Sequence, residues 1–533
     1  MQDSTMRWLV RDQVPFNSYD YLQQTLITAN GFREYDLRWL LGKEINPNGF
    51  YVLGRAYGSF AQMRYGETKV VVGHDFRQYS QECCRSLILG LLSSGAHVLD
   101  IGLATTPMVY FAQHCFGVKA AAMVTASHNE NGWTGLKLAK GLSATFEPDD
   151  IACFQQIVMG DEFKSGNGHY EAVDGVYDRY SDDILQQGAL NGPVKVVVAA
   201  GNGTAGCFAP RLLSRLGCDV IPLDCDGDWT FPNHNPNPED VAFLRSISSK
   251  TVETGAALGI GIDGDGDRIG VVDGQGRVIF SDKLGLLMAR WLCQSVGGRP
   301  IVIDVKSTGL FNDDAILRAA KANVIIWKTG HSYIKAKVAE SDAIAGFEKS
   351  GHWFFNHPFG RGYDDAMLSS VLLLRFLSQS KQRLAELVDS LPATWQSPTL
   401  GAYCPDHVKY GVVDEVAKQY EEDYRYGRTI MGRIIKELIT VNGIRFVLDD
   451  DSWGLVRASS NKPSLVVVGE ARSSADELVA IIEDIQRRLK MTGKVGDYDQ
   501  QLSALDLTTT AGAVHEPPLR DKLPDKSELP EAN

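Results

Sequence analysis

The sequence predicts an α/β protein made of three similar α/β domains followed by a small C-terminal α+β domain. Continuous apolar runs alternate with helical patterns up to about Leu391, which is typical of parallel strands covered by helices on both faces. A strand–loop–helix theme recurs three times along this stretch. Beyond Leu391, short strands precede a single helix, as in an α+β domain. A chain of 533 residues is long enough for about three to five such domains.

The elements follow in this order. In the first domain, residues 69–73 and 120–125 predict buried strands and residues 85–94 predict a helix. Later strands are predicted at residues 194–200, 258–262, 269–272, 300–304, 323–327, 454–457 and 464–469, with a helix at 475–489. The predicted divisions are an N-terminal extension (1–30), α/β domains at 31–172, 173–277 and 278–391, an α+β domain at 392–492, and a disordered tail at 493–533, which is rich in Pro, Asp, Lys, Thr and Glu.

The composition excludes several classes of protein. A net charge of −13 argues against affinity of the whole chain for nucleic acid or an anionic membrane. The nine cysteines lack C-x-x-C spacing, so no zinc knuckle or thioredoxin motif is expected, and an odd count fits a reducing compartment. No apolar run reaches the roughly 18 residues that a transmembrane helix needs, and the N-terminus has no secretion signal. We therefore predict a cytoplasmic protein.

A metal site is predicted in the loop DGDGDR. Asp263, Asp265 and Asp267 alternate with glycines between two apolar runs, and carboxylate oxygens on such a loop suit Mg²⁺. Arg268 adds a planar donor for a phosphate oxygen. An EF-hand is excluded because Gly274 stands where that motif requires Glu. Two alternatives stay open, a phosphatase in which Asp263 is the nucleophile and a plain polar turn.

The segment TASHNENG directly follows a predicted strand and carries Ser127. It is not G-x-S-x-G, so an α/β-hydrolase elbow is not supported. The neighbouring His128 is not by adjacency alone a base for the serine. Ser127 could instead carry a phosphoryl group, which is close to a dianion at neutral pH and needs cationic or amide partners. The alternative is a polar turn with a capping serine.

Two further segments carry groups that could bind hydroxyls or a phosphate. In GFEKSGH, Glu348, Ser350 and His352 alternate, which predicts that they point one way on an extended segment. Glu348 and Ser350 could then take two neighbouring sugar hydroxyls. In RASSNKP, one arginine, two hydroxyls and an amide between two strands form a plausible phosphate nest. A structural turn is the alternative for each segment.

The segment GNGTAG (residues 201–206) matches the dinucleotide-binding pattern G-x-G-x-x-G after a strand. Asp219 and Asp224 lie near the distance expected for a ribose-binding acid. A dinucleotide site would leave the other four motifs without a role. We therefore interpret these glycines as a tight strand-to-helix turn, with a dinucleotide-binding protein as the alternative.

Taken together, these motifs resemble the α-D-phosphohexomutase superfamily. In the family's order, the matching stretches are FREYDLR (32–38), TASHN (125–129), GLK (135–137), DGDGDR (263–268), KTGHS (328–332), EKSGH (348–352) and RASSNKP (457–463). They span residues 30–490. The chain departs from the usual family residues at Trp39, at Glu130 and at Ser460–Asn461–Lys462.

The resemblance implies four domains around a central cleft and an intramolecular phosphotransferase of the phosphomannomutase/phosphoglucomutase type. Catalysis is assigned to Ser127, His128, Lys137, Arg268 and His331, with Lys137 and His331 matching general acid–base positions. Substrate binding is assigned to Tyr35, Arg38, Lys306, Glu348, Ser350, His352, Arg457, Ser459, Ser460 and Asn461. The metal ligands are Ser127 as phosphoserine, Asp263, Asp265 and Asp267.

The implied reaction interconverts hexose 1-phosphate and hexose 6-phosphate, of mannose or glucose or both. It proceeds through a phosphoserine enzyme and a hexose 1,6-bisphosphate, with Mg²⁺ as cofactor and the bisphosphate as activator. The implied partner is a small phosphosugar, with no nucleic acid and no membrane, and the oligomeric state is left open. Phosphoglucosamine mutase remains an alternative, although members of that group tend to have Gln in place of Lys349.

Overall fold

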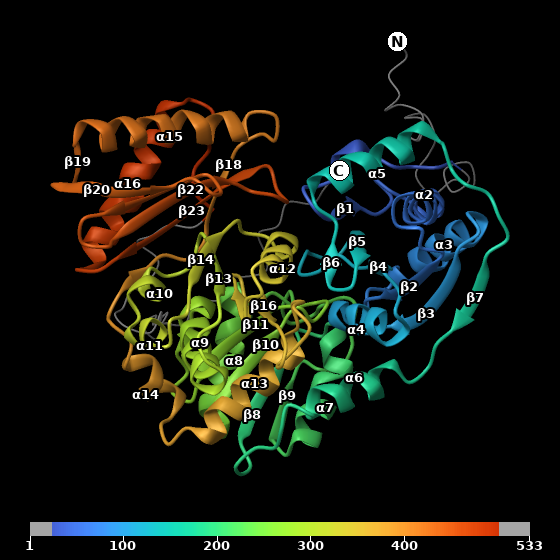
Figure 1. Cartoon of the computed structure of the whole chain (residues 1–533), viewed down its shortest axis with the longest axis horizontal. Helices are drawn as coiled ribbons and strands as arrows, with labels where there is room; N and C mark the ends of the chain where they lie inside the picture. The colour runs from blue at the N-terminus through green and yellow to red at the C-terminus, as the bar shows by residue number, and fades with distance from the viewer. Residues whose placement is uncertain (1–23, 500–533) are drawn as a thin grey trace, which may run out of the picture.

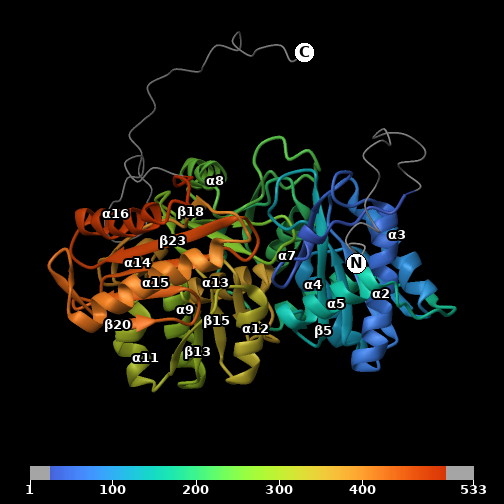
Figure 2. The same ribbon diagram turned by 90° about the horizontal axis from the view of Figure 1, so that it is seen from above.

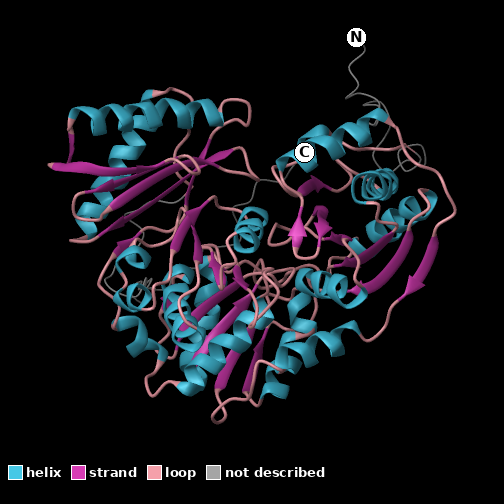
Figure 3. Ribbon diagram, in the orientation of Figure 1, coloured by secondary structure: helices cyan, strands magenta, loops and turns pink. Residues whose placement is uncertain are grey.

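The computed structural model describes residues 24–499. Four β-sheets follow one another along the chain, and the first and fourth lie at opposite upper sides of Figure 1, with the second and third below them. Helices cover the faces of the first three sheets, and the sheets stay distinct from one another in the view coloured by secondary structure (Figure 3). The predicted architecture of three α/β domains and a C-terminal α+β domain is confirmed.

The first three sheets share one topology. Each contains three parallel strands, with the first strand of the set in the middle, followed by an antiparallel fourth strand. The spatial orders are β3-β2-β4-β5, β9-β8-β10-β11 and β14-β13-β15-β16. The recurring strand–loop–helix theme of the sequence therefore corresponds to a true structural repeat.

The elements of the first two units have these bounds. The first unit has strands β1 (Leu37–Leu40), β2 (Lys69–His74), β3 (His97–Leu103), β4 (Ala120–Val124), β5 (Trp133–Gly141), β6 (Ala144–Thr145) and β7 (His169–Ala172), with η2 (Ala29–Gly31), α2 (Pro47–Tyr65), α3 (Ser80–Ser93), α4 (Thr106–Phe116) and α5 (Pro148–Gly160). The second has α6 (Val176–Leu185), β8 (Lys195–Ala199), η3 (Thr204–Cys207), α7 (Ala209–Leu216), β9 (Asp219–Leu223), α8 (Val241–Thr254), β10 (Leu258–Ile262), β11 (Ile269–Asp273) and β12 (Val278–Ile279).

The third and fourth units continue the chain. The third has α9 (Ser281–Val296), β13 (Ile301–Asp304), α10 (Leu310–Asp313), α11 (Ala315–Ala319), β14 (Val324–Trp327), α12 (His331–Glu340), β15 (Ala345–Phe347), β16 (Trp353–Phe355), α13 (Ala366–Gln379) and α14 (Leu384–Asp389). The fourth has β17 (Trp395–Gln396), β18 (Leu400–Tyr403), α15 (Lys409–Tyr426), β19 (Thr429–Ile430), β20 (Arg433–Ile439), β21 (Ile444–Leu448), β22 (Trp453–Ala458), β23 (Ser464–Ala471) and α16 (Ala475–Met491).

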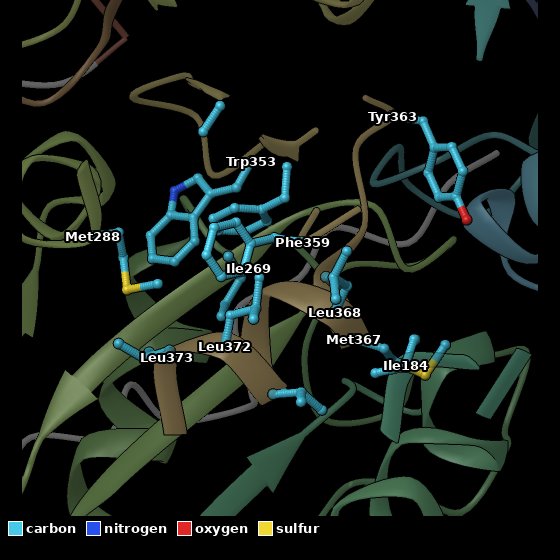
Figure 4. Packing of buried hydrophobic residues seen from close by; sticks show 14 of the residues in the cluster. Ile184, Ile269, Met288, Trp353, Phe359, Tyr363, Met367, Leu368, Leu372 and Leu373 are labelled. Carbon is cyan, nitrogen blue, oxygen red and sulfur yellow. The ribbon is translucent and has the colours of Figure 1, made fainter. Parts of the chain in front are cut away.

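One hydrophobic core runs through the first three units. Figure 4 shows part of it, where Trp353 of β16, Ile269 of β11 and Leu372 of α13 lie close together. Burial of apolar area on this scale is the main stabilising contribution to folding. Because the same core packs against all three sheets, it fixes the positions of the loops at their ends.

The fourth unit packs its antiparallel sheet on two sides. Helices α15 and α16 cover one face with their own core, and Figure 2 shows this unit beside the third from above. On the other face, Val447, Trp453 and Leu455 pack against Val305 of the third unit. This apolar contact joins the fourth unit to the third.

The ends of the described chain are also paired. Ile27 forms a bridge with Ile45, and residues 496–499 run beside β18 through backbone hydrogen bonds to residues 401 and 403. The predicted tail thus begins in a paired stretch, and its residues 500–533, like residues 1–23, lie outside the described residues. Every helix between residues 24 and 499 is too short or too polar to cross a bilayer.

Candidate active site

The three equivalent units each place a predicted functional loop at the same point of the fold. Ser127 follows β4, Asp263 follows β10 and Glu348 follows β15. Each of these strands is the third parallel strand of its sheet, and each loop leads into the antiparallel fourth strand. Ligands of open α/β sheets bind at the carboxyl ends of strands, so the repeat delivers three chemically different loops to one place.

Ser127 lies in a strained turn beside the acidic loop. Its backbone is left-handed, with φ 53°, a conformation that a non-glycine residue adopts at a cost and that is common at functional sites. Its Oγ lies 3.2 Å from His128 Nδ1 and 3.4 Å from Asp263 Oδ2. The structure therefore brings the serine and the acidic loop, 136 residues apart in sequence, within contact distance.

Gly264 permits this approach. A Cβ built on Gly264 would lie only 2.5 Å from the carbonyl oxygen of Ser127. Both atoms belong to backbone, so neither could move aside as a flexible side chain would. The glycine between the first two aspartates is therefore required by the close approach of two loops.

The acid triplet is fully buried. The carboxylate oxygens of Asp263, Asp265 and Asp267 lie within 4.8 Å of one another. Asp263 Oδ1 accepts three backbone N–H groups, from residues 266, 267 and 268, at 3.0 to 3.2 Å. Within the described chain, Oδ1 of both Asp265 and Asp267 is buried without a hydrogen-bond partner. Buried, unpartnered carboxylate oxygens are costly unless a cation completes them, so these residues fit a hard divalent ion.

Protonation of the triplet is set by its surroundings. Burial, together with the charges of Asp267 and Asp265, raises the pKa of Asp263 well above its ordinary value. Burial also acts to raise the pKa of Asp265, but the Lys137 ammonium and a 2.7 Å hydrogen bond from Thr106 hold it below its ordinary value. Three carboxylates cannot all ionise at this spacing without a compensating cation.

Lys137 supplies a compensating charge from β5. Its Nζ lies 2.9 Å from Asp265 Oδ2 and also contacts Asp267. Burial acts to lower the pKa of Lys137, yet the two carboxylates overcome it and raise the pKa above its ordinary value. The lysine is therefore an ammonium ion here, and in this state it can donate a proton but cannot accept one.

Arg268 and His352 form the next layer. Arg268 Nε donates to His352 Nε2 at 2.9 Å, and its Nη1 lies 3.6 Å from Glu239. The two residues also form a backbone bridge. This contact ties the acidic loop of the second unit to the turn between β15 and β16 of the third.

His128 and His331 are both held neutral. Burial and the cations Arg268 and Lys462 lower the pKa of His128. Burial and Lys335 lower the pKa of His331 to about 4, against the opposing charge of Asp36. A neutral imidazole near physiological pH can exchange a proton with substrate.

The segment predicted to bind the sugar is a turn. The prediction of an extended segment at residues 348–352 is wrong, because these residues connect the antiparallel strands β15 and β16. The 348 carbonyl accepts from the N–H of Gly351, whose φ is +99°. Glu348 and Ser350 still meet, with Ser350 Oγ donating to Glu348 Oε2 at 3.2 Å. Glu348 Oε1 accepts from Gly330 N–H at 2.5 Å.

The two lysines near this turn have different surroundings. Lys306 Nζ lies 3.7 Å from Asp304 Oδ2 at the end of β13. Lys349 Nζ lies 3.9 Å from the ring centre of Phe280, and burial lowers its pKa. Within residues 24–499, this Nζ is buried without a hydrogen-bond partner and contacts the face of the Phe280 ring.

The predicted phosphate nest contains buried polar side-chain atoms. Among residues 24–499, Arg457 Nε, Ser460 Oγ and Asn461 Oδ1 are buried without a hydrogen-bond partner. Lys409 Nζ of α15 fixes the loop by donating to the carbonyls of Ser459 and Lys462 at 2.6 and 3.2 Å. A phosphate would give the donors of this loop their missing partner.

The segment before β1 contacts the third and fourth units. The Tyr35 ring packs edge-on against His331 at 4.9 Å between ring centres, where Gly330 leaves room for it. Arg38 pairs with Asp36 at 3.0 Å. Arg33 pairs with Asp406 at 3.2 Å, which joins the first unit to the fourth.

The glycines of GNGTAG support the metal loop. A Cβ on Gly203 would lie 3.2 Å from Gly264 Cα, and one on Gly206 would lie 2.3 Å from the carbonyl oxygen of Cys225. The N–H of Thr204 donates to the Gly264 carbonyl at 3.3 Å. Protein backbone therefore occupies the space that a dinucleotide pyrophosphate would need, and the glycines serve a tight turn.

Sequence reasoning missed a buried pair beneath the serine. Asp75 and Arg77 follow β2, at the same edge as Ser127. Arg77 Nη2 donates to the Ser127 carbonyl at 2.9 Å, and Asp75 Oδ2 accepts from Ala126 N–H at 3.3 Å. Arg77 Nη1 also holds the carbonyl of Glu130 at 3.0 Å, while the Glu130 residue itself is exposed. The sequence feature that could have identified this pair is an aspartate and an arginine, two residues apart, just after a predicted parallel strand.

This combination of fold and site defines an α-D-phosphohexomutase, and therefore an enzyme. Comparisons with known proteins agree. Residues 29–164, 178–276 and 280–395 match the family models of phosphoglucomutase/phosphomannomutase alpha/beta/alpha domains I, II and III, respectively. Residues 407–488 match the model of the family's C-terminal domain. The chain belongs to the phosphoglucomutase/phosphomannomutase family.

Several relatives are similar over most of the chain. A phosphomannomutase/phosphoglucomutase of Pseudomonas aeruginosa is 35% identical over 464 residues, 87% of this chain and 96% of the relative. A phosphoglucomutase of Neisseria gonorrhoeae is 34% identical over 471 residues, 87% of this chain and 96% of the relative. The crystal structure of a phosphoglucomutase/phosphomannomutase family protein from Burkholderia thailandensis superposes with a TM-score of 0.79 at 33% identity, covering 89% of this chain and all of that one.

Proposed function

We propose that this phosphohexomutase interconverts the 1-phosphate and 6-phosphate of mannose or glucose through a phosphoserine at Ser127. The observation that carries the proposal is the 3.4 Å contact between Ser127 Oγ and Asp263 inside the buried acid triplet. Relatives named for mannose and glucose phosphates support the substrate class. A hexose 1,6-bisphosphate is the intermediate and also the activator.

The acid triplet and phosphorylated Ser127 would together hold a Mg²⁺ ion. The unpartnered oxygens of Asp265 and Asp267 support this assignment. Bound there, the ion would neutralise charge on the phosphoryl oxygens. Lys137 and Arg268 surround the same point with fixed positive charge, which preorganises the site for a phosphoryl group.

Transfer begins with the substrate phosphate in the nest around Arg457. Glu348 and Ser350 orient the sugar through two hydroxyls, and this placement accounts for much of the rate enhancement. The bond between Ser127 Oγ and phosphorus breaks as a bond from phosphorus to the free sugar hydroxyl forms. That hydroxyl loses its proton and Ser127 gains one.

We assign the proton exchange to Lys137. Lys137 carries an ammonium in this state, so it begins as the acid. His331 is neutral, which keeps a second cation away from this exchange. After the bisphosphate reorients, its other phosphoryl group returns to Ser127. The nest must therefore bind phosphate at either end of the sugar.

The first test is mass spectrometry of freshly purified protein, in which we expect one phosphate on the peptide containing Ser127. Ser127→Ala should abolish normal turnover of glucose 1-phosphate and mannose 1-phosphate, assayed with a catalytic amount of bisphosphate. The matched control is Ser246→Ala, because that hydroxyl donates to the Phe243 carbonyl of its own helix α8 at 2.8 Å. Full isomerase activity in Ser127→Ala would refute the proposal.

The same variants separate the competing functions. A phosphatase with Asp263 as nucleophile would keep phosphate release in Ser127→Ala and lose it in Asp263→Asn. A phosphoglucosamine mutase would favour glucosamine phosphates, and a relative described as a probable phosphoglucosamine mutase, from Methanothermobacter thermautotrophicus, is 31% identical over 412 residues. Initial rates with the three sugar phosphates decide the substrate. A cytoplasmic location is also proposed, which nine unpaired cysteines support.

A further inference from the structure

A buried ion pair connects the two histidines of the third unit. Lys335 Nζ lies 2.9 Å from His331 Nδ1 and 2.9 Å from Asp364 Oδ1. The other oxygen of Asp364 lies 2.9 Å from His352 Nδ1. All four residues are at most 4% exposed. The functional assignment above gives Asp364 no role, and it gives Lys335 none beyond its effect on the pKa of His331.

The chemistry of the donors fixes the tautomer of His331. A lysine ammonium has three N–H donors and no acceptor, so His331 Nδ1 must accept from Lys335. The ring proton then lies on Nε2, which faces Asp36 Oδ1 at 3.2 Å. Arg38 in turn holds Asp36 through its other oxygen at 3.0 Å.

The same logic applies to His352. An arginine side chain can only donate, and Arg268 Nε lies 2.9 Å from His352 Nε2. Nε2 is therefore the acceptor, and the ring proton lies on Nδ1, toward Asp364. The two histidines are thus held as opposite tautomers, with their ring centres 5.8 Å apart.

We propose that Lys335 and Asp364 are positioning residues that hold His331 and His352 in fixed orientations and opposite tautomers for phosphoryl transfer. This inference rests on the proposed function of the site. An acid behind a histidine fixes which ring nitrogen is available and where the ring points. Here one ion pair fixes the orientation and the tautomer of two rings at once.

A purely structural role explains less of the geometry. A buried ion pair is weak evidence for stability, because desolvation of both charges offsets their attraction. Lys335 also contacts Tyr110, at 3.3 Å from its hydroxyl and 4.6 Å from its ring centre. An ion pair needed only for packing has no reason to place its lysine in hydrogen-bond contact with His331 and its carboxylate 2.9 Å from His352 Nδ1.

The pair also controls the charge of His331. The groups facing this ring are Lys335 on its own helix, Asp36 and Tyr35 from the segment before β1, Asp364 from the segment before α13, and His352 from the turn before β16. Burial and the Lys335 cation lower the pKa of His331 to about 4, while Asp36 and Asp364 oppose the shift. Loss of Lys335 should therefore raise that pKa.

The test compares the double variant Lys335→Met/Asp364→Asn with Lys337→Met. The double variant removes both charges at once, so neither is left unpaired in the interior. The control loses a lysine two residues along α12 whose ion pair with Glu340 is at the surface. Circular dichroism confirms folding, and mass spectrometry of the Ser127 peptide reports the phosphoserine separately, so failure of the proposed function is distinguishable.

We expect kcat of the double variant to fall about 100-fold, as for a misplacement near 1 Å, with KM within about threefold of wild type. The acid limb of its kcat/KM profile should move up by at least about one pH unit. The single variant Lys335→Arg keeps the positive charge and the N–H donors, so its kcat should lie between that of the double variant and that of wild type. An unchanged pH profile and kcat in the folded double variant would overturn the proposal.

A second measurement determines the tautomers of the two histidine rings in the wild-type protein. In protein with ¹⁵N-labelled histidine, signals assigned by their loss in His331→Gln and His352→Gln should show His331 protonated at Nε2 and His352 at Nδ1. His331 protonated at Nδ1 would overturn the proposal even if the double variant fails to fold.

Discussion

Gly264→Ala tests the close approach of the serine loop to the metal loop. A Cβ at this position would meet the Ser127 carbonyl oxygen at 2.5 Å, where an ordinary contact begins at 3.4 Å. The two backbones would therefore have to part by about 1 Å, the difference between these distances. That movement separates Ser127 Oγ from Asp263, which lie 3.4 Å apart.

The expected magnitudes follow from this displacement. A shift near 1 Å in the reacting groups costs about 100-fold in rate. Overpacking of a buried site lowers the free energy of unfolding by about 1–3 kcal/mol. Since a stable domain has about 5–15 kcal/mol, the variant should stay folded while losing most of its turnover.

The assay is the initial rate of isomerisation with saturating glucose 1-phosphate and catalytic bisphosphate, together with urea unfolding. The matched control is Gly411→Ala on α15, where an added Cβ meets nothing within 4 Å. It should keep full activity and gain about 0.5–1 kcal/mol, because alanine favours helix over glycine. Turnover of Gly264→Ala within twofold of wild type would refute the steric reasoning.

Two further predictions concern buried charge. Burial raises the pKa of Asp365, the N-cap of α13, to about 7, so the folded chain keeps a proton that the unfolded chain releases near pH 4. The free energy of unfolding should therefore fall between about pH 4 and pH 7, by up to about 1.4 kcal/mol per pH unit. Urea unfolding of Asp365→Asn should lack this fall, and an identical pH slope in both proteins would contradict the assignment. Lys137→Met removes the ammonium that competes for Asp265 and Asp267, so calorimetry should detect about tenfold tighter Mg²⁺ binding although turnover falls. Unchanged or weaker Mg²⁺ binding would count against this competition.

The sequence predicted the elements that depend on local pattern. Apolar runs of strand length gave β4, β10 and β22, and the loops that follow them carry Ser127, the acid triplet and the phosphate nest. Alternation of aspartate with glycine allows three carboxylates to converge within one turn, so the metal loop could be recognised without knowing its partners. The same reasoning failed for residues 348–352, because alternation also occurs in a hairpin turn.

Contacts between distant residues were decided only by the tertiary structure. Asp36 and His331 lie 295 residues apart, and Lys137 and Asp267 lie 130 apart. No local pattern encodes these pairs, because they arise when shared apolar cores bring the ends of different sheets together. The sequence by itself determined which residues can do chemistry and on which loops they stand. Only packing of the four units decided which charges face one another, and therefore which lysine is an ammonium, which histidine stays neutral and which glycine must lack a side chain.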